Sequence, residues 1–113
     1  MKRGVSRQFQ KGSRDANEPQ ITAVLKAANE PYKLLPTGWG ADIIGESAPM
    51  YYIEVKTATG KLTEVEKAKK WECEERGVEY YILRTPEETA AMLNRRASRA
   101  ELNRVLLAPE LEG

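Results

Sequence analysis

Three charged side chains in two short stretches of the chain carry the clearest chemical signal. In the apolar run 51–57, an acid and a base stand two positions apart as Glu54 and Lys56, and a further acid, Asp42, precedes them across turn-forming residues. If these two stretches are paired strands, Asp42 and Glu54 come close together. Two close carboxylates repel each other unless a cation lies between them. Their oxygen atoms are the ligands that Mg²⁺ prefers.

The alternation of side chains along a β-strand predicts which residues of the stretch 51–57 face this site. Side chains of a strand point to opposite faces in turn, so we expect Ile53 and Val55 to face the core. Glu54 and Lys56 then share the opposite face, which must line a solvated site because burying charges in so apolar a strand is costly. The carbonyl oxygen of Val55 is a further candidate metal ligand. Lys56 would stand beside a metal-bound water, where it can orient the water or offset charge on a phosphate.

The composition restricts the chemistry further. The 113 residues include no histidine, which excludes the usual Ser-His-Asp and Cys-His catalysis and His-ligated zinc. The single cysteine, Cys73, cannot form an internal disulfide, and a reducing, cytoplasmic setting fits this usage. No stretch approaches the roughly 20 apolar residues of a membrane span, so we expect no membrane partner.

Basic side chains gather at both ends of the chain. Residues 1–14 contain five basic residues and no acid, and a second basic cluster lies within residues 95–104. We interpret residues 1–14 as a flexible basic arm that suits a polyanion such as nucleic acid, although solubility alone explains such an arm equally well. The candidate nucleic-acid-binding residues are Lys2, Arg3, Arg7, Lys11, Arg14 and Lys61.

The elements that position these residues follow from apolar spacing and turn signals. Apolar residues between 21 and 28 recur with helical spacing and predict an amphipathic helix, capped by Asn17 or Glu18. Strands are expected over 32–35, around 41–44 and over 51–57, at hairpin spacing.

The second half of the chain alternates helix and strand. Thr63 and Glu66 form a capping-box pattern that opens a helix ending near Arg76, with Gly77 as its stop. A strand over 78–84 follows, and further helices open at residues 85 and 98. The expected fold class is α/β, with a mixed β-sheet flanked by helices in the order αβββαβαα.

This ordered set of residues resembles the PD-(D/E)xK nuclease superfamily, and more narrowly the VRR-NUC domain family. That family comprises small stand-alone phage nucleases and the nuclease modules of larger repair enzymes. The resemblance covers residues 18–93 and rests on Glu18 in a preceding helix, the stretch 40–45, the strand 53–57 and the turn 60–63. It implies a restriction-endonuclease-like fold, with a nuclease domain over 15–95 and a C-terminal helix and tail over 96–113.

The resemblance also implies an activity. Family members hydrolyse DNA phosphodiesters with Mg²⁺, for which Mn²⁺ substitutes, in the cytoplasm of bacterial or phage-infected cells. Asp42 and Glu54 match the metal carboxylates, Val55 lies between the motif residues, Lys56 matches the catalytic lysine, and Glu18 matches the first-helix acid. Stand-alone members are similar to Holliday-junction resolvases, which cut branched DNA as homodimers. The candidate dimer contact is the apolar stripe Leu102, Val105 and Leu106, for which packing within the chain is an alternative.

Two positions depart from the family pattern, and several residues have a simpler interpretation. Ala41 stands where Pro is usual, and Glu66 stands where a Gln is usual. Glu66 is better explained as a capping residue, and Glu18 is equally well explained as a helix cap. Asp42 could be an acid that favours the preceding turn. Glu54 and Lys56 could form an exposed ion pair on an edge strand. Trp39 could stack on a base or fill the core under its turn.

Two other functions remain open from the sequence. The chain could be a non-catalytic nucleic-acid-binding module on a nuclease scaffold. It could also be a nuclease acting on flaps, single strands or RNA, because residues that contact phosphate do not read bases.

Overall fold

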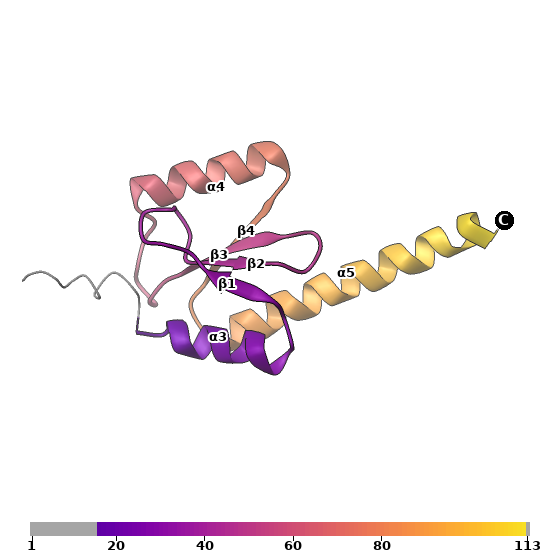
Figure 1. The fold of residues 1–113 in the computed structure, drawn as a ribbon, viewed down its shortest axis with the longest axis horizontal. Helices are drawn as coiled ribbons and strands as arrows, with labels where there is room; N and C mark the ends of the chain where they lie inside the picture. The colour runs from indigo at the N-terminus through magenta and orange to yellow at the C-terminus, as the bar shows by residue number, and fades with distance from the viewer. Residues whose placement is uncertain (1–15, 113) are drawn as a thin grey trace, which may run out of the picture.

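A four-stranded mixed sheet forms the centre of the molecule (Figure 1). The computed structural model describes residues 16–112, and the side chains of residues 16–106. The strands lie in the order β1 (Tyr32–Leu34), β2 (Ile43–Gly45), β3 (Tyr51–Val55) and β4 (Glu79–Leu83). The first three strands are antiparallel, and β3 and β4 are parallel. The expected α/β fold with a mixed sheet is confirmed.

Helices lie on both faces of this sheet. Figure 1 shows α3 (Glu18–Ala27) and α5 (Pro86–Glu112) on one face and α4 (Glu64–Arg76) on the other. Because β3 and β4 are parallel, the chain must cross from one end of the sheet to the other between them, and α4 is that crossover. No helix in the described residues is both long enough and apolar enough to cross a membrane.

The core lies between the sheet and the pair α3–α5. Alternate residues of β3, Tyr51, Ile53 and Val55, are at most 1% exposed, and they pack with Ile21 and Leu25 of α3 in one cluster. The predicted inward face of β3 is therefore confirmed. The other face of β3, which carries Glu54, is turned toward α4.

One contact in this core leaves no room for a side chain. A Cβ atom added to Gly45 would lie 2.1 Å from Cζ of Tyr51 and 2.4 Å from the Cε1 atom of the same ring. The ring cannot move away, because its hydroxyl donates to Glu30 at 2.7 Å and the Arg96 guanidinium lies 4.0 Å from the ring centroid.

We therefore expect Gly45→Ala to lower the free energy of unfolding by about 3 kcal/mol or more, at the upper end of the cost of overpacking. Urea unfolding followed by circular dichroism measures this change. Gly60→Ala is the control, since its Cβ would meet Thr57 Oγ1 at 3.1 Å and no ring. Equal stability of the two variants would contradict the packing described for Tyr51.

The boundaries of α4 follow the sequence signals. The hydroxyl of Thr63 accepts from the Glu66 amide at 3.2 Å, and the Glu66 carboxylate accepts from the Thr63 amide at 2.8 Å. Gly77 ends the helix in the left-handed conformation, with φ of 72°. The predicted capping box and stop are confirmed.

The end of the chain differs from the expected order. The two helices expected after β4 are a single helix, α5, which runs through residue 98 without a break. Residues 94–100 contain neither Gly nor Pro, and a Ser without a preceding break does not start a new helix. The expected boundary between residues 95 and 96 falls inside α5. The expected basic arm, residues 1–14, lies outside the described residues.

Candidate functional site

The pairing of β2 and β3 brings two acids together. Ile43 lies opposite Ile53 in the antiparallel register, and the Asp42 amide continues the ladder by donating to the Ile53 carbonyl at 2.9 Å. Asp42 is the residue before β2, and it lines the same pocket as Glu54. The hairpin thus brings these two carboxylates to one pocket, as expected, and the charge of Asp42 acts on Glu54.

Asp42 and Glu54 line a pocket of about 340 Å³ between the sheet and the first turn of α4. The rim consists of the segment that leads into β2 and the start of α4, including Leu35, Thr37, Gly38, Gly40, Thr63, Val65 and Glu66. Asp42 is fixed in this pocket because its Oδ2 atom accepts from the Val55 amide at 2.8 Å. The backbone of β3 at Val55 thus orients the carboxylate of Asp42.

Lys56 lies at the end of β3 and contacts two acids. Its Nζ atom is 3.3 Å from Oε2 of Glu54 and 2.8 Å from Oε1 of Glu66, and only 13% of its side chain is exposed. Glu54 is 3% exposed and lies on an interior strand of the sheet. The alternative of an exposed ion pair on an edge strand is therefore wrong.

Glu66 has a second contact that the sequence analysis did not assign. It completes the capping box of α4, as predicted, and it also accepts from Lys56. The available signal was the short connection 57–62, which keeps the first turn of α4 next to the end of β3. A capping residue at that position necessarily lies beside Lys56.

The two acids beside Lys56, Glu54 and Glu66, differ in their pKa values. Burial, the charge of Asp42, and the hydrogen bond and charge of Glu66 together raise the pKa of Glu54 to about 9, against the opposing effect of Lys56. Glu54 therefore keeps a proton at neutral pH when no cation is bound. Burial also raises the pKa of the Glu66 carboxyl, but hydrogen bonds from Lys56 and the Thr63 amide outweigh this, and the net pKa is lowered.

Lys56 stays charged in this setting. Burial by itself lowers the pKa of its ammonium group, but the hydrogen bond to Glu66 and the charge of Glu54 outweigh burial and raise it. The Lys56 ammonium therefore lies between the ionised carboxylate of Glu66 and the protonated carboxyl of Glu54.

The donor set fits a divalent cation that keeps much of its water. Within the described residues, no three acidic or cysteine side chains already surround one metal position. Mg²⁺ does not need such a cage, because it binds one or two protein carboxylates and takes its other ligands from water and substrate phosphate. Asp42 and Glu54 meet this requirement, with the carbonyl of Val55 as a third candidate ligand, and the proton on Glu54 would be released on binding.

Glu18, unlike Asp42 and Glu54, does not line this pocket. It is buried at the start of α3, on the other face of the sheet. The neighbouring Asn17 donates from Nδ2 to the carbonyls of Lys56 and Arg84 at 2.9 and 3.0 Å. Asn17 occupies the expected cap position, but its side chain ties α3 to β3 rather than capping α3. The role of Glu18 stays a prediction.

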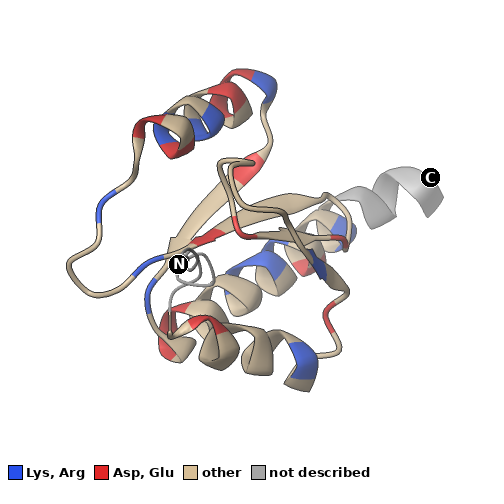
Figure 2. Cartoon of the chain, turned by 60° about the vertical axis from the view of Figure 1, so that its left-hand side comes forward, with Lys and Arg blue, Asp and Glu red and all other residues tan. Residues whose placement is uncertain are grey.

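Lys61 is the one candidate nucleic-acid-binding residue within the described part of the chain. It is exposed on the loop 56–63, which the guanidinium of Arg84 holds through the carbonyls of Thr57 and Gly60. The other five, Lys2, Arg3, Arg7, Lys11 and Arg14, lie outside the described residues. Figure 2 shows acidic and basic residues mixed along α4, so the described body presents no uniformly basic helix there.

Comparisons of the chain with protein-family models, with curated proteins and with solved structures gave no match. The interpretation of the site therefore depends on its own geometry. Two opposed carboxylates and a charged lysine at the edge of one pocket can hold a hydrated cation and a phosphate side by side.

Proposed function

We propose that the chain is a Mg²⁺-dependent nuclease that hydrolyses DNA phosphodiesters in the pocket between the sheet and α4. The observation that carries this proposal is that Asp42 and Glu54 line one pocket, with the Nζ atom of Lys56 3.3 Å from Oε2 of Glu54. The absence of histidine from the chain supports a metal-assisted route. The sequence resemblance points the same way.

The charged residues in and beside the pocket each have a part in this reaction. A bound Mg²⁺ supplies Lewis-acid stabilisation of the scissile phosphate and lowers the pKa of a bound water. Asp42, fixed by the Val55 amide, and Glu54 would hold that cation. The ammonium of Lys56 stands beside them, where it orients the attacking water and offsets the negative charge that builds on the phosphate. Glu66 holds Lys56 in this position.

The finer proposals concern substrate and assembly. We propose an endonuclease that acts on branched DNA, including Holliday junctions, as a homodimer with two sites for two strands. Leu102, Val105 and Leu106 are 56, 54 and 62% exposed on α5, so the apolar stripe of this helix is available to a second copy. The expectation that these residues pack within the chain is not met. A monomer in sedimentation at micromolar concentration would contradict the dimer.

The experiment that tests the activity is a cleavage assay with labelled DNA. Linear duplex, nicked, flap and four-way-junction substrates are incubated with Mg²⁺, with Mn²⁺ and with EDTA. We expect products only with a cation, and most product from a branched substrate. Binding without products in either metal would overturn the nuclease proposal.

That negative outcome would favour a non-catalytic nucleic-acid-binding module. One observation supports this second candidate: Lys56 is fully engaged by Glu54 and Glu66. Products from flaps alone would narrow the substrate to branched DNA with a single-stranded arm, and products from single strands or RNA alone would revise it.

The five basic residues of positions 1–14 are expected to supply most of the phosphate contacts. Without this segment, 13 basic residues face 17 acidic ones, and a body of that charge repels DNA. We expect a chain lacking residues 1–14 to bind a duplex with a salt slope shallower by up to about 4.5, since each of five phosphate contacts contributes about 0.9. Fluorescence anisotropy at several salt concentrations measures the slope. An unchanged slope would remove these residues from the interface.

A further inference from the structure

A tryptophan lies exposed at the rim of the candidate pocket. Trp39 is 53% exposed, and the residues on either side of it, Gly38 and Gly40, both line the pocket that contains Asp42 and Glu54. The alternative that Trp39 fills the core beneath its turn is therefore wrong. An exposed aromatic ring at this position is available to a molecule that enters the pocket.

The backbone holds Trp39 in this exposed position. Gly38 and Gly40 have φ of 92° and 87°, a conformation that other residues rarely adopt. The carbonyl of Gly40 accepts from the Tyr80 hydroxyl at 2.6 Å. A Cβ atom on Gly40 would lie 2.6 Å from Cβ of Lys69, so the turn packs directly against α4. The indole is thus presented by an anchored turn.

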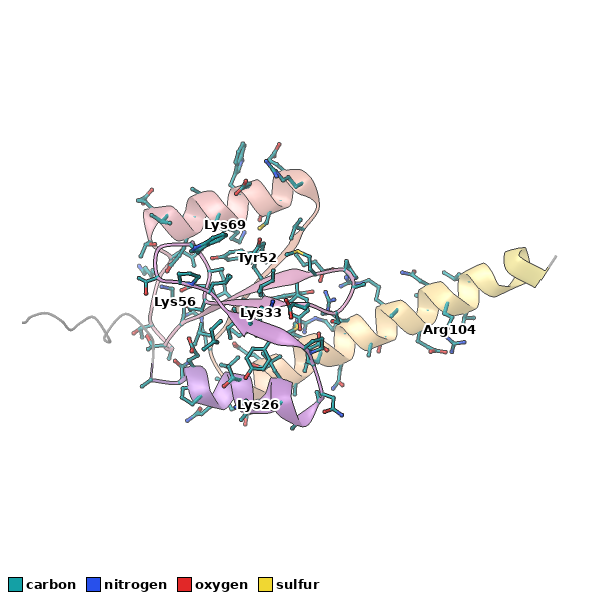
Figure 3. All side chains as sticks on the ribbon, in the orientation of Figure 1. Lys26, Lys33, Tyr52, Lys56, Lys69 and Arg104 are labelled. Carbon is teal, nitrogen blue, oxygen red and sulfur yellow. The ribbon has the colours of Figure 1, made fainter. Side chains whose placement is uncertain are left out.

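A cation lies beside the ring. The Lys69 ammonium is 4.5 Å from the centroid of Tyr52 and 5.9 Å from the centroid of Trp39. Figure 3 shows Lys69 and Tyr52 between α4 and the sheet, on the same side as Lys56. An exposed aromatic face next to a positive charge is the combination by which proteins bind single-stranded nucleic acid, through base stacking and backbone attraction.

We propose that Trp39 stacks on an unpaired base of the DNA strand whose phosphate enters the pocket. The preferred substrate then has a single-stranded nucleotide next to the cleaved bond, as at a flap or an open branch point. A base inside a duplex has both faces covered by its neighbours, so it cannot stack on the indole without leaving the helix. This inference rests on the proposed nuclease function and narrows its substrate class.

Stacking is measured first, without cleavage. The chain has two tryptophans, and Trp71, 63% exposed on α4, does not line the pocket. In EDTA, the Trp71→Phe variant reports on Trp39 alone, and the Trp39→Phe variant reports on Trp71 alone. We expect a ten-nucleotide oligothymidylate to quench the fluorescence of Trp39 and to leave that of Trp71 unchanged. Equal quenching of both, or quenching of Trp39 by a blunt duplex as strongly as by the oligothymidylate, would overturn the proposal.

Cleavage then shows whether the stacked base lies at the reacting strand. A base–aromatic stack of ordinary strength corresponds to a change of about 5- to 100-fold. Trp39→Ala is expected to slow cleavage of a flap by about that factor and cleavage of a blunt duplex less than about twofold, with Trp39→Tyr restoring most of the loss. Trp71→Ala is the matched control and is expected to change neither rate. An equal loss on both substrates would overturn the substrate preference.

The two proposals fail in different ways. If no variant cleaves any DNA but oligothymidylate still quenches Trp39 selectively, the nuclease function fails and the stacking surface stands. If wild-type protein cleaves DNA but Trp39 is not quenched, the stacking proposal alone fails. Stronger quenching by oligouridylate than by oligothymidylate would assign the surface to RNA and contradict the DNA proposal.

Discussion

Replacing Asp42 with Ala is expected to lower the rate of DNA cleavage at least about 10³-fold. A metal ion that stabilises charge in the transition state contributes several kcal/mol, and each 1.4 kcal/mol corresponds to about a factor of ten. Removing one of two carboxylates that hold the cation forfeits much of that contribution. Single-turnover cleavage of a labelled substrate at saturating Mg²⁺ measures the loss, and DNA binding is expected to stay close to wild type.

The Asp42→Asn variant removes the negative charge of this side chain but keeps its hydrogen-bond acceptor. An amide oxygen at this position can still accept from the Val55 amide, which lies 2.8 Å from Asp42 Oδ2, so this variant should fold normally while losing as much activity as Asp42→Ala. An Asp42→Asn protein with full activity would refute the site.

Lys56→Ala is expected to slow cleavage about 10²- to 10³-fold, the usual cost of removing one group that stabilises transition-state charge. Lys33→Ala is the matched control, since Lys33 also pairs with an acid, Glu46 at 3.5 Å, but lies exposed on β1 and outside the pocket. Equal rates for the two lysine variants would contradict the role of Lys56.

The second large effect concerns stability and pH. Glu54 has an ordinary pKa of 4.5 when unfolded and about 9 when folded, so between these values the folded state holds a proton that the unfolded state has lost. Its contribution to stability is fully present below about pH 4.5 and is lost as the pH rises toward 9. The slope from this group approaches about 1.4 kcal/mol per pH unit. Urea unfolding in EDTA from pH 5 to pH 9 measures it.

Glu54→Gln removes this pH dependence, because the amide does not titrate. We expect the variant to be more stable than wild type at pH 8.5 in EDTA and to be inactive. Added Mg²⁺ should stabilise the wild type more at pH 8 than at pH 6, because cation and proton compete for the same carboxylate, and should not stabilise Glu54→Gln appreciably. A wild type whose stability is flat over this range would contradict the burial of Glu54 beside Asp42.

The sequence predicts the parts of the site that depend on local rules. Strand alternation places Glu54 and Lys56 on the face opposite Ile53, and the hairpin between β2 and β3 brings Asp42 into the same pocket as Glu54. The capping box fixes the start of α4. Each of these features depends on residues within a few positions of one another, or on a single hairpin.

The remaining features depend on contacts between distant segments. The contact of Glu66 with Lys56 requires α4 to dock on the end of β3, and the exposure of Trp39 depends on how its turn meets Lys69. Asn17 ties α3 to Lys56 and Arg84 across the sheet. Apart from the short connection 57–62, which keeps the start of α4 near the end of β3, composition and spacing contain no signal for such packing. A capping pattern at Ser98 favours a new helix there, but no helix-breaking residue precedes it, and α5 is therefore continuous.

The most direct test of the site is a crystal of the protein soaked in MnCl₂ and measured at the manganese absorption edge. The account predicts an anomalous peak between the carboxylates of Asp42 and Glu54, at about 2.0–2.2 Å from their oxygen atoms, with Lys56 beside it, and no such peak in Asp42→Asn. A wild-type crystal without anomalous density at these two side chains, or with the cation bound elsewhere, would contradict it.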